Sequence, residues 1–195
     1  MRKTKTEKMV VLSLLAGMAF ILLKLDFFIL PTFPWMKLDF SDIPILIGTL
    51  IYGPISGIII AFIRSLLNYV MSGADLGSLI GNTTGFVASV LFLLPIHFFM
   101  KKKNNIKGLV TGTFVSTLLL TGFMAVANYF VILPIYLFVL KLNFEMPMSE
   151  MIIFGVIPFN LIKGVFVSLI FGVTYKKIIP ILEKRMQINS KASLK

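Results

Sequence analysis

The run Met151–Tyr175, MIIFGVIPFNLIKGVFVSLIFGVTY, is apolar at nearly every position. It is long enough to cross a bilayer, since a spanning helix needs about 20 mainly apolar residues. Its centre nevertheless holds Pro158-Phe159-Asn160-Leu161-Ile162-Lys163-Gly164, with an amide and an amine far from either end. An ammonium at mid-bilayer costs about 3 kcal/mol on insertion scales, so such a group normally faces a cavity or a partner. Because Asn160 and Lys163 are three positions apart, a helix places them on one face, which is the first candidate for a functional site.

A structural role for this face remains the alternative. In that case Lys163 would extend along the helix to an interface and Asn160 would bond to a neighbouring helix. The central position of Lys163 in the run disfavours this interpretation, because its side chain cannot easily reach either end.

The composition places the whole chain in a membrane. Of its 195 residues 57% are hydrophobic and 14% are charged, whereas soluble domains have about 45–50% and 25%. Several windows are long enough to span a bilayer, which predicts an all-α, polytopic membrane protein with one domain over residues 1–195. The chain has no cysteine, which excludes disulfides and thiolate metal sites.

The basic residues define an orientation. Most of the 19 Lys and Arg residues form three clusters, and most acids lie in the connections between them. Basic connections stay on the cytoplasmic side, so the basic start (residues 1–8) and the tail (183–195) are both predicted inside. The clusters are Arg2, Lys3, Lys5 and Lys8; Lys101, Lys102, Lys103 and Lys107; and Lys176, Lys177, Lys184, Arg185, Lys191 and Lys195.

The net charge of +11 therefore reflects topology rather than nucleic-acid binding. A nucleic-acid surface would need one contiguous basic patch with exposed aromatic side chains, and the sequence has no such stretch. We expect the lipid bilayer to be the partner of these charges. The chain is then a multi-pass protein of the cell membrane, and its first helix is expected to remain uncleaved.

Six spanning helices satisfy this charge pattern. If the run 43–71 were one helix, the basic cluster Lys101–Lys107 would lie on the outer side of the membrane, against the charge rule. A turn at Gly53-Pro54 divides the run into two helices and adds one crossing, which places the cluster on the cytoplasmic side. Residues 24–42 then form the first outer loop. We expect Ser41 or Asp42 to cap the second helix. The expected helices are Met9–Leu23, Ile43–Tyr52, Ile55–Met71, Leu79–Met100, a helix within Gly108–Leu140 that Pro134 ends or kinks, and a last helix from Ser149 or Glu150 to Tyr175-Lys176-Lys177.

Polar residues inside these helices gather in the outer half of the predicted bundle. We expect a pocket that opens outward and that the first outer loop could cover. Two other polar residues keep open roles: Arg64 pairs with an acid or faces lipid headgroups, and His97 is expected at the inner interface. The candidate pocket residues are Asn82, Thr83, Asn128, Asn160 and Lys163.

Several chemistries lack their motif in this sequence. It contains no Walker A loop, so the chain cannot hydrolyse ATP itself. It contains neither His-Glu-x-x-His nor Gly-x-Ser-x-Gly, and a single histidine without cysteine excludes the common zinc sites. We expect no catalytic residues, no metal and no cofactor, and energy for any transport must come from another chain.

Four strings resemble a known family: Leu38-Asp39-Phe40-Ser41-Asp42-Ile43-Pro44, Tyr52-Gly53-Pro54-Ile55-Ser56-Gly57, Asn128-Tyr129 and Pro158–Gly164. They are similar to the riboflavin-specific substrate-binding (S) components of energy-coupling factor (ECF) transporters, and the similarity covers nearly the whole chain. It implies a six-helix protein that captures riboflavin at the outer face. It also implies a transmembrane coupling protein and two ATP-binding cassette ATPases as partners, and leaves open whether flavin mononucleotide is carried.

The resemblance also implies roles for particular residues. Asn128, Asn160 and Lys163 would bond to the uracil-like edge of the ring system, and the loop Asp39–Ser41 would hold the ribityl hydroxyls. The ligand-binding set is then Asp39, Phe40, Ser41, Asn82, Thr83, Asn128, Tyr129, Asn160 and Lys163.

The first helix is the expected contact with the coupling protein. The family carries Ala-x-x-x-Ala there, and the nearest equivalent is Ser13-x-x-x-Gly17 beside Ala16. Small residues let another helix approach closely, but packing within the chain would use them equally well.

Three other functions stay open. The chain could be an S component for another vitamin such as thiamine or pantothenate. It could be an intramembrane enzyme with Lys163 as a base, which would need a second titrating group, or a structural membrane protein with replaceable polar residues.

Overall fold

The fold is a bundle of membrane-length helices. The computed structural model describes residues 5–33, 35–103, 105–138, 140–141 and 146–192, with side chains as far as Lys177. Within these residues, five helical runs are long and apolar enough to cross a membrane, and the shorter helix α2 completes six. This confirms the all-α, six-helix prediction. The five runs are Lys5–Leu23, Pro54–Met71, Leu76–Lys102, Ile106–Phe138 and Met148–Lys177.

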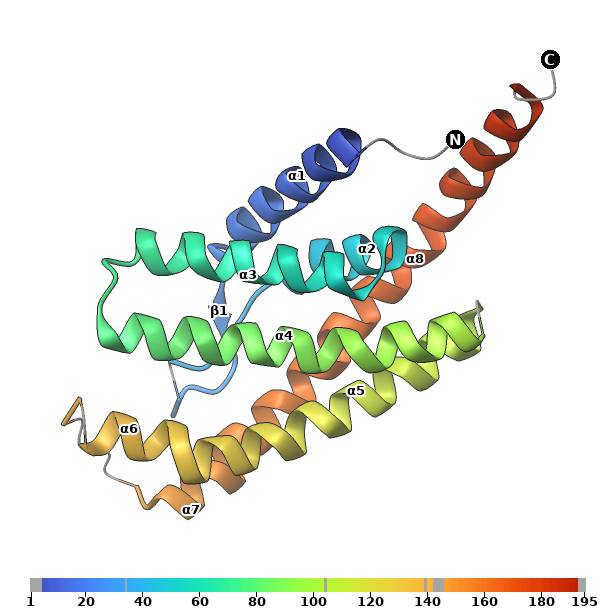
Figure 1. The fold of residues 1–195 in the computed structure, drawn as a ribbon. Coiled ribbons are helices and arrows are strands. Elements are labelled where there is room, and N and C mark those ends of the chain that lie inside the picture. The colour runs from blue at the N-terminus through green and yellow to red at the C-terminus, as the bar shows by residue number, and fades with distance from the viewer. Residues whose placement is uncertain (1–4, 34, 104, 139, 142–145, 193–195) are drawn as a thin grey trace.

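Figure 1 shows the helices and strands coloured in chain order. Their bounds are α1 Lys5–Leu23, β1 Phe27–Phe28, β2 Lys37–Leu38, α2 Asp42–Tyr52, α3 Pro54–Met71, α4 Leu76–Lys102, α5 Ile106–Ala127, the π-helix η1 Asn128–Ile132, α6 Leu133–Phe138, α7 Met148–Glu150, the π-helix η2 Met151–Val156 and α8 Ile157–Ala192.

The ends of the chain agree with the predicted topology. Figure 1 shows the start of α1 and the end of α8 at the same end of the bundle as the α2–α3 and α4–α5 turns, while the α3–α4 turn lies at the opposite end. Lys101 and Lys102 lie in the last turn of α4 and Lys103 directly follows it, so these basic residues are on the same side as the start of α1 and the end of α8. We call the end with the α3–α4 turn the outer end.

The break at Gly53-Pro54 is confirmed. Helix α2 ends at Tyr52 and α3 begins at Pro54, with Gly53 between them at φ +88°, a conformation that favours glycine. Pro54 occupies the first helical position, where its missing N–H costs nothing. A Cβ at Gly57 would overlap Thr49, so α2 and α3 pack with their backbones close together.

Two prolines follow stretches of π-helix. The run that starts at Ile106 does not end at Pro134 but continues to Phe138, and η1 ends two residues before that proline. Likewise, η2 ends two residues before Pro158. A proline clashes with the carbonyl four residues earlier, and a wider turn in the preceding segment relieves that clash.

Other boundaries differ from the expected ones. Helix α4 begins at Leu76 rather than Leu79, because the Asp75 carboxylate accepts a hydrogen bond from the Ser78 amide at 2.8 Å. Helix α8 continues to Ala192 instead of ending at Tyr175-Lys176-Lys177. The residues after Lys177 include many good helix formers, so the helix extends through most of the predicted tail 183–195.

The first outer loop contains a small hairpin that the sequence did not predict. Strands β1 and β2 pair in antiparallel fashion, with Phe27 opposite Leu38. An ion pair of 3.1 Å between Lys37 and Asp26 closes it. Phe40 packs against the rings of Phe27 and Phe166, with centroid distances of 6.1 and 5.4 Å, and this three-ring cluster fixes the loop against α8.

Candidate functional site

A cavity of about 660 Å³ lies in the outer part of the bundle. Its walls come from the hairpin loop, α3, α4, the α5–η1–α6 run and α8, so chain segments distant in sequence meet there. Ligand pockets usually have volumes of about 300–1,000 Å³. The cavity is therefore large enough for a small organic molecule.

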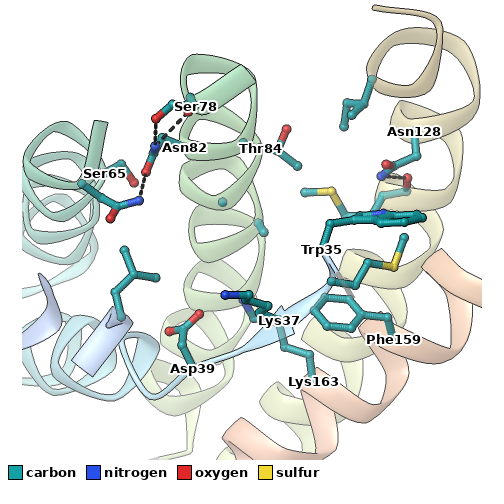
Figure 2. A pocket seen from close by; sticks show the side chains of 18 of the residues that line it. Trp35, Lys37, Asp39, Ser65, Ser78, Asn82, Thr84, Asn128, Phe159 and Lys163 are labelled. Carbon is teal, nitrogen blue, oxygen red and sulfur yellow. Dashed lines mark hydrogen bonds between the residues drawn. The ribbon is translucent and has the colours of Figure 1, made fainter. Parts of the chain in front are cut away.

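One side of the cavity offers flat apolar surfaces and amides. Figure 2 shows Trp35, Phe159 and Asn128 gathered on that side. The amides of Asn128 and Asn160 each donate one hydrogen bond of 2.8 Å to their own helix, to the carbonyls of Met124 and Val156. Each amide therefore keeps its oxygen and a second N–H for a ligand.

The opposite side carries a chain of polar groups. The Lys24 ammonium donates to Asn68 Oδ1 at 2.7 Å, and the Asn68 amide donates to Asn82 Oδ1 at 2.7 Å. Asn82 in turn donates to the Ser78 carbonyl at 2.8 Å, as Figure 2 shows. These bonds join α3 to α4 and to the end of α1 along the cavity wall.

A buried charge cluster borders the cavity, and two of its members, Arg64 and Lys163, line the cavity wall. The Asp42 carboxylate is 3.4 Å from the Lys163 ammonium and 3.6 Å from the Arg64 guanidinium, and it accepts a 2.5 Å hydrogen bond from Ser89. Arg64 also donates to Ser41 Oγ at 2.7 Å. Arg64 thus pairs with an acid, which settles the alternative that the sequence left open. Buried charges need such partners, because an uncompensated one is strongly destabilising.

The structure brings five of the predicted ligand-binding residues to the cavity wall. Asp39 comes from the hairpin loop, and its carboxylate accepts a 2.7 Å hydrogen bond from the Ser41 amide. The five are Asp39, Asn82, Asn128, Asn160 and Lys163.

The other four do not line the cavity. Ser41 is fully buried beneath it, where it bonds to Arg64 and makes no side-chain cap for α2. Phe40 packs in the ring cluster described above. Tyr129 is 42% exposed on the surface of the bundle, where its ring packs against Phe130. Thr83 points outward from α4, and its neighbour Thr84 lines the cavity instead.

The spacing along α4 could have excluded Thr83. The residues that face the cavity include Ser78, Asn82 and Gly85, which follow one helical face at intervals of four and three. Ser78 and Asn68 were missed although each lies four residues from a polar position already noted. Trp35 also lines the cavity, and only the fold of the loop reveals that.

The predicted partner-binding residues of α1 separate into two groups. Ala16 is 1% exposed and packs inside the bundle, and its contact with a coupling protein stays a prediction. Ser13 is exposed, and a Cβ at Gly17 would meet nothing within 4 Å. Among the described residues, no group of three His, Cys, Asp or Glu side chains could hold a metal ion.

Comparisons with known proteins agree on one family. Residues 7–175 match the family model described as the ECF transporter, substrate-specific component. The chain is 36% identical to the riboflavin transporter FmnP of Bacillus subtilis, over 93% of this chain and 96% of that protein. It is 35% identical to the riboflavin transporter RibU of Staphylococcus aureus, over 92% and 94% of the two chains.

A solved structure has the same fold. It is described as the structure of the S component of a bacterial ECF transporter, and it matches with a TM-score of 0.78 and 36% identity over 92% of this chain and 99% of that one. The chain belongs to the family of substrate-specific components of ECF transporters.

Proposed function

We propose that this protein captures riboflavin at the outer face of the cell membrane and serves its uptake as an S component. The observation that carries the proposal is the cavity, with flat side chains on one side and hydrogen-bonding groups on the others. The similar transporters of B. subtilis and S. aureus are both named riboflavin transporters, which supports the same ligand here.

The cavity suits the two chemical parts of riboflavin. Trp35 and Phe159 offer faces against which a tricyclic ring can stack. We propose that Asn128, Asn160 and Lys163 bond to the uracil-like edge, since amides offer both donor and acceptor. The polar wall formed by Asn68, Ser78 and Asn82 then suits the ribityl hydroxyls.

The energy for uptake must come from partner chains, because the sequence has no ATP-binding motif. We propose a transmembrane coupling protein and two ATP-binding cassette ATPases as those partners. The contact with the coupling protein would use Ser13 and Gly17, which lie on the exposed side of α1.

Riboflavin should copurify with the protein. We expect preparations from cells to show the visible absorption band of a flavin, and mass spectrometry of the released molecule to give the mass of riboflavin. A protein washed free of ligand in mild denaturant and refolded should take up riboflavin stoichiometrically. Thiamine or pantothenate in place of riboflavin would support an S component for another vitamin and contradict the proposed ligand.

Flavin mononucleotide should bind more weakly than riboflavin. In and next to the cavity wall, the described cations are equal in number to the carboxylates, namely Lys24, Lys37, Arg64 and Lys163 against Asp26, Asp39, Asp42 and Asp75. A bound phosphate would therefore bring negative charge to a site without net positive charge, with a loss of affinity of roughly tenfold or more.

Competition titration measures that difference directly. Both flavins are titrated into ligand-free protein, and the quenching of flavin fluorescence gives the two dissociation constants. Equal affinities would contradict the charge argument but not riboflavin binding itself.

A further inference from the structure

Asp42 holds an unusual position for an acid in a membrane protein. Its carboxylate is 2% exposed and stands at the first residue of α2, directly after the hairpin loop. The groups around it come from three other helices: Arg64 from α3, Ser89 from α4 and Lys163 from α8. One carboxylate therefore joins four helices beneath the cavity.

The two carboxylate oxygens have separate partners. Oδ1 accepts the 2.5 Å hydrogen bond from Ser89 and lies 3.6 Å from Arg64 Nη1. Oδ2 faces the Lys163 ammonium at 3.4 Å. Arg64 cannot follow the carboxylate freely, because its guanidinium donates to Ser41 at 2.7 Å and to Ser65 at 3.2 Å. Oδ1 is thus fixed from one side, and Oδ2 is left for the lysine.

Lys163 needs such a fixed partner. Its side chain is long and flexible, and an unrestrained ammonium would lose rotamer entropy when it bonds to a ligand. Within the described part of the chain, Asp42 is the one acid at ion-pair distance from Lys163. Lys163 also lines the cavity, so the position of its ammonium along the wall depends on Oδ2 of Asp42.

We propose that Asp42 is a positioning residue of the binding site: it holds the Lys163 ammonium at the cavity wall and does not itself touch the ligand. The inference rests on the proposed riboflavin site and adds a specific dependence of Lys163 on Asp42. Preorganisation of this kind raises affinity by removing the cost of ordering the side chain during binding.

A purely structural role for Asp42 must be separated from positioning. If Asp42 only neutralised two buried cations, its loss would destabilise the protein whatever residue occupied position 163. If Asp42 acts through Lys163, its loss should reduce affinity only while Lys163 is present. A double-mutant cycle measures this difference.

The cycle uses the full chain with D42N, K163M and D42N/K163M, each titrated with riboflavin in detergent. We expect D42N to weaken binding about tenfold when Lys163 is present and less than about threefold in the K163M background. S116A is the matched control, because it removes a buried hydroxyl that bonds to the Phe92 carbonyl at 2.7 Å and lies outside both the charge cluster and the cavity lining; we expect it to change affinity by less than about threefold.

An equal loss from D42N in both backgrounds would overturn the inference. If D42N does not fold, the same cycle is measured in the R64Q background, where one cation is removed together with the carboxylate and the charge balance is kept. The same non-additivity is expected there, and additivity would again overturn the inference. Failure of the unmodified protein to bind riboflavin would instead contradict the proposed function.

Discussion

Replacing Lys163 with alanine should weaken riboflavin binding by roughly tenfold or more, since a lost buried hydrogen bond costs about 1–3 kcal/mol. The ammonium lines the cavity next to Asn160, and both come from the same face of α8. The loss also leaves the Asp42 carboxylate with Arg64 as its only nearby described cation. We expect Asn160→Ala to have a comparable effect, because the Asn160 amide has an unused oxygen and N–H on the cavity side.

Fluorescence titration of the purified variants tests this expectation. Leu161→Ala is the matched control, since Leu161 lies between the two polar residues in sequence but is 38% exposed on the outer surface of α8. It should bind riboflavin as the unmodified protein does. Unchanged affinity in both Lys163→Ala and Asn160→Ala would contradict the assignment of this face to the ligand.

The helical bundle could be predicted from the sequence because each helix is visible as a local apolar run and the topology follows from counting charges in the connections. A run such as Met151–Tyr175 is apolar by composition alone, and the positions of the basic clusters fix the side of each turn. The break at Gly53-Pro54 followed from counting crossings against those charges. The confirmed features, namely six helices with the start of α1 and the end of α8 at one end of the bundle, all depend on information of this kind.

The cavity could be predicted only in part, because its details depend on helix phase and on the loop. Asn128 and Tyr129 are neighbours in a π-helix, where the wider turn changes the angle between successive side chains, and one of them faces lipid. The hairpin places Asp39 in the cavity wall and turns Phe40 and Ser41 away from it. No local pattern reports that arrangement.

The charge cluster was the most important feature that the sequence could not establish. Arg64 and Lys163 were each recognised as unusual, but their shared partner Asp42 looked like a helix cap. The three residues come from α3, α8 and the start of α2, so only the packing of the helices brings them together. A buried cation in a membrane segment predicts that a partner exists, and the fold identifies it.

Replacing Gly164 with valine should destabilise the protein by about 1–3 kcal/mol, the usual cost of overpacking a well-packed contact. Any Cβ at Gly164 would overlap the side chain of Thr117 on α5, whose own Cβ would be 2.8 Å away. Thr117 is buried and its hydroxyl already bonds to the Thr113 carbonyl at 2.8 Å, so it has little freedom to move. Helices α5 and α8 must therefore separate, and their separation shifts Asn160 and Lys163 relative to Asn128.

Thermal unfolding in detergent and riboflavin affinity, measured on the same samples, should both decrease for Gly164→Val. Gly172 provides the control in the same helix, because a Cβ there would meet nothing within 4 Å. Gly172→Ala should leave the riboflavin affinity unchanged. Its unfolding temperature should be unchanged or slightly higher, since alanine favours a helix by about 1 kcal/mol over glycine. Adding Thr117→Gly to Gly164→Val removes the overlapping atoms and should restore part of both losses. If Gly164→Val behaved like the Gly172 control, the close contact between α5 and α8 would not determine the position of Asn160 and Lys163 relative to Asn128.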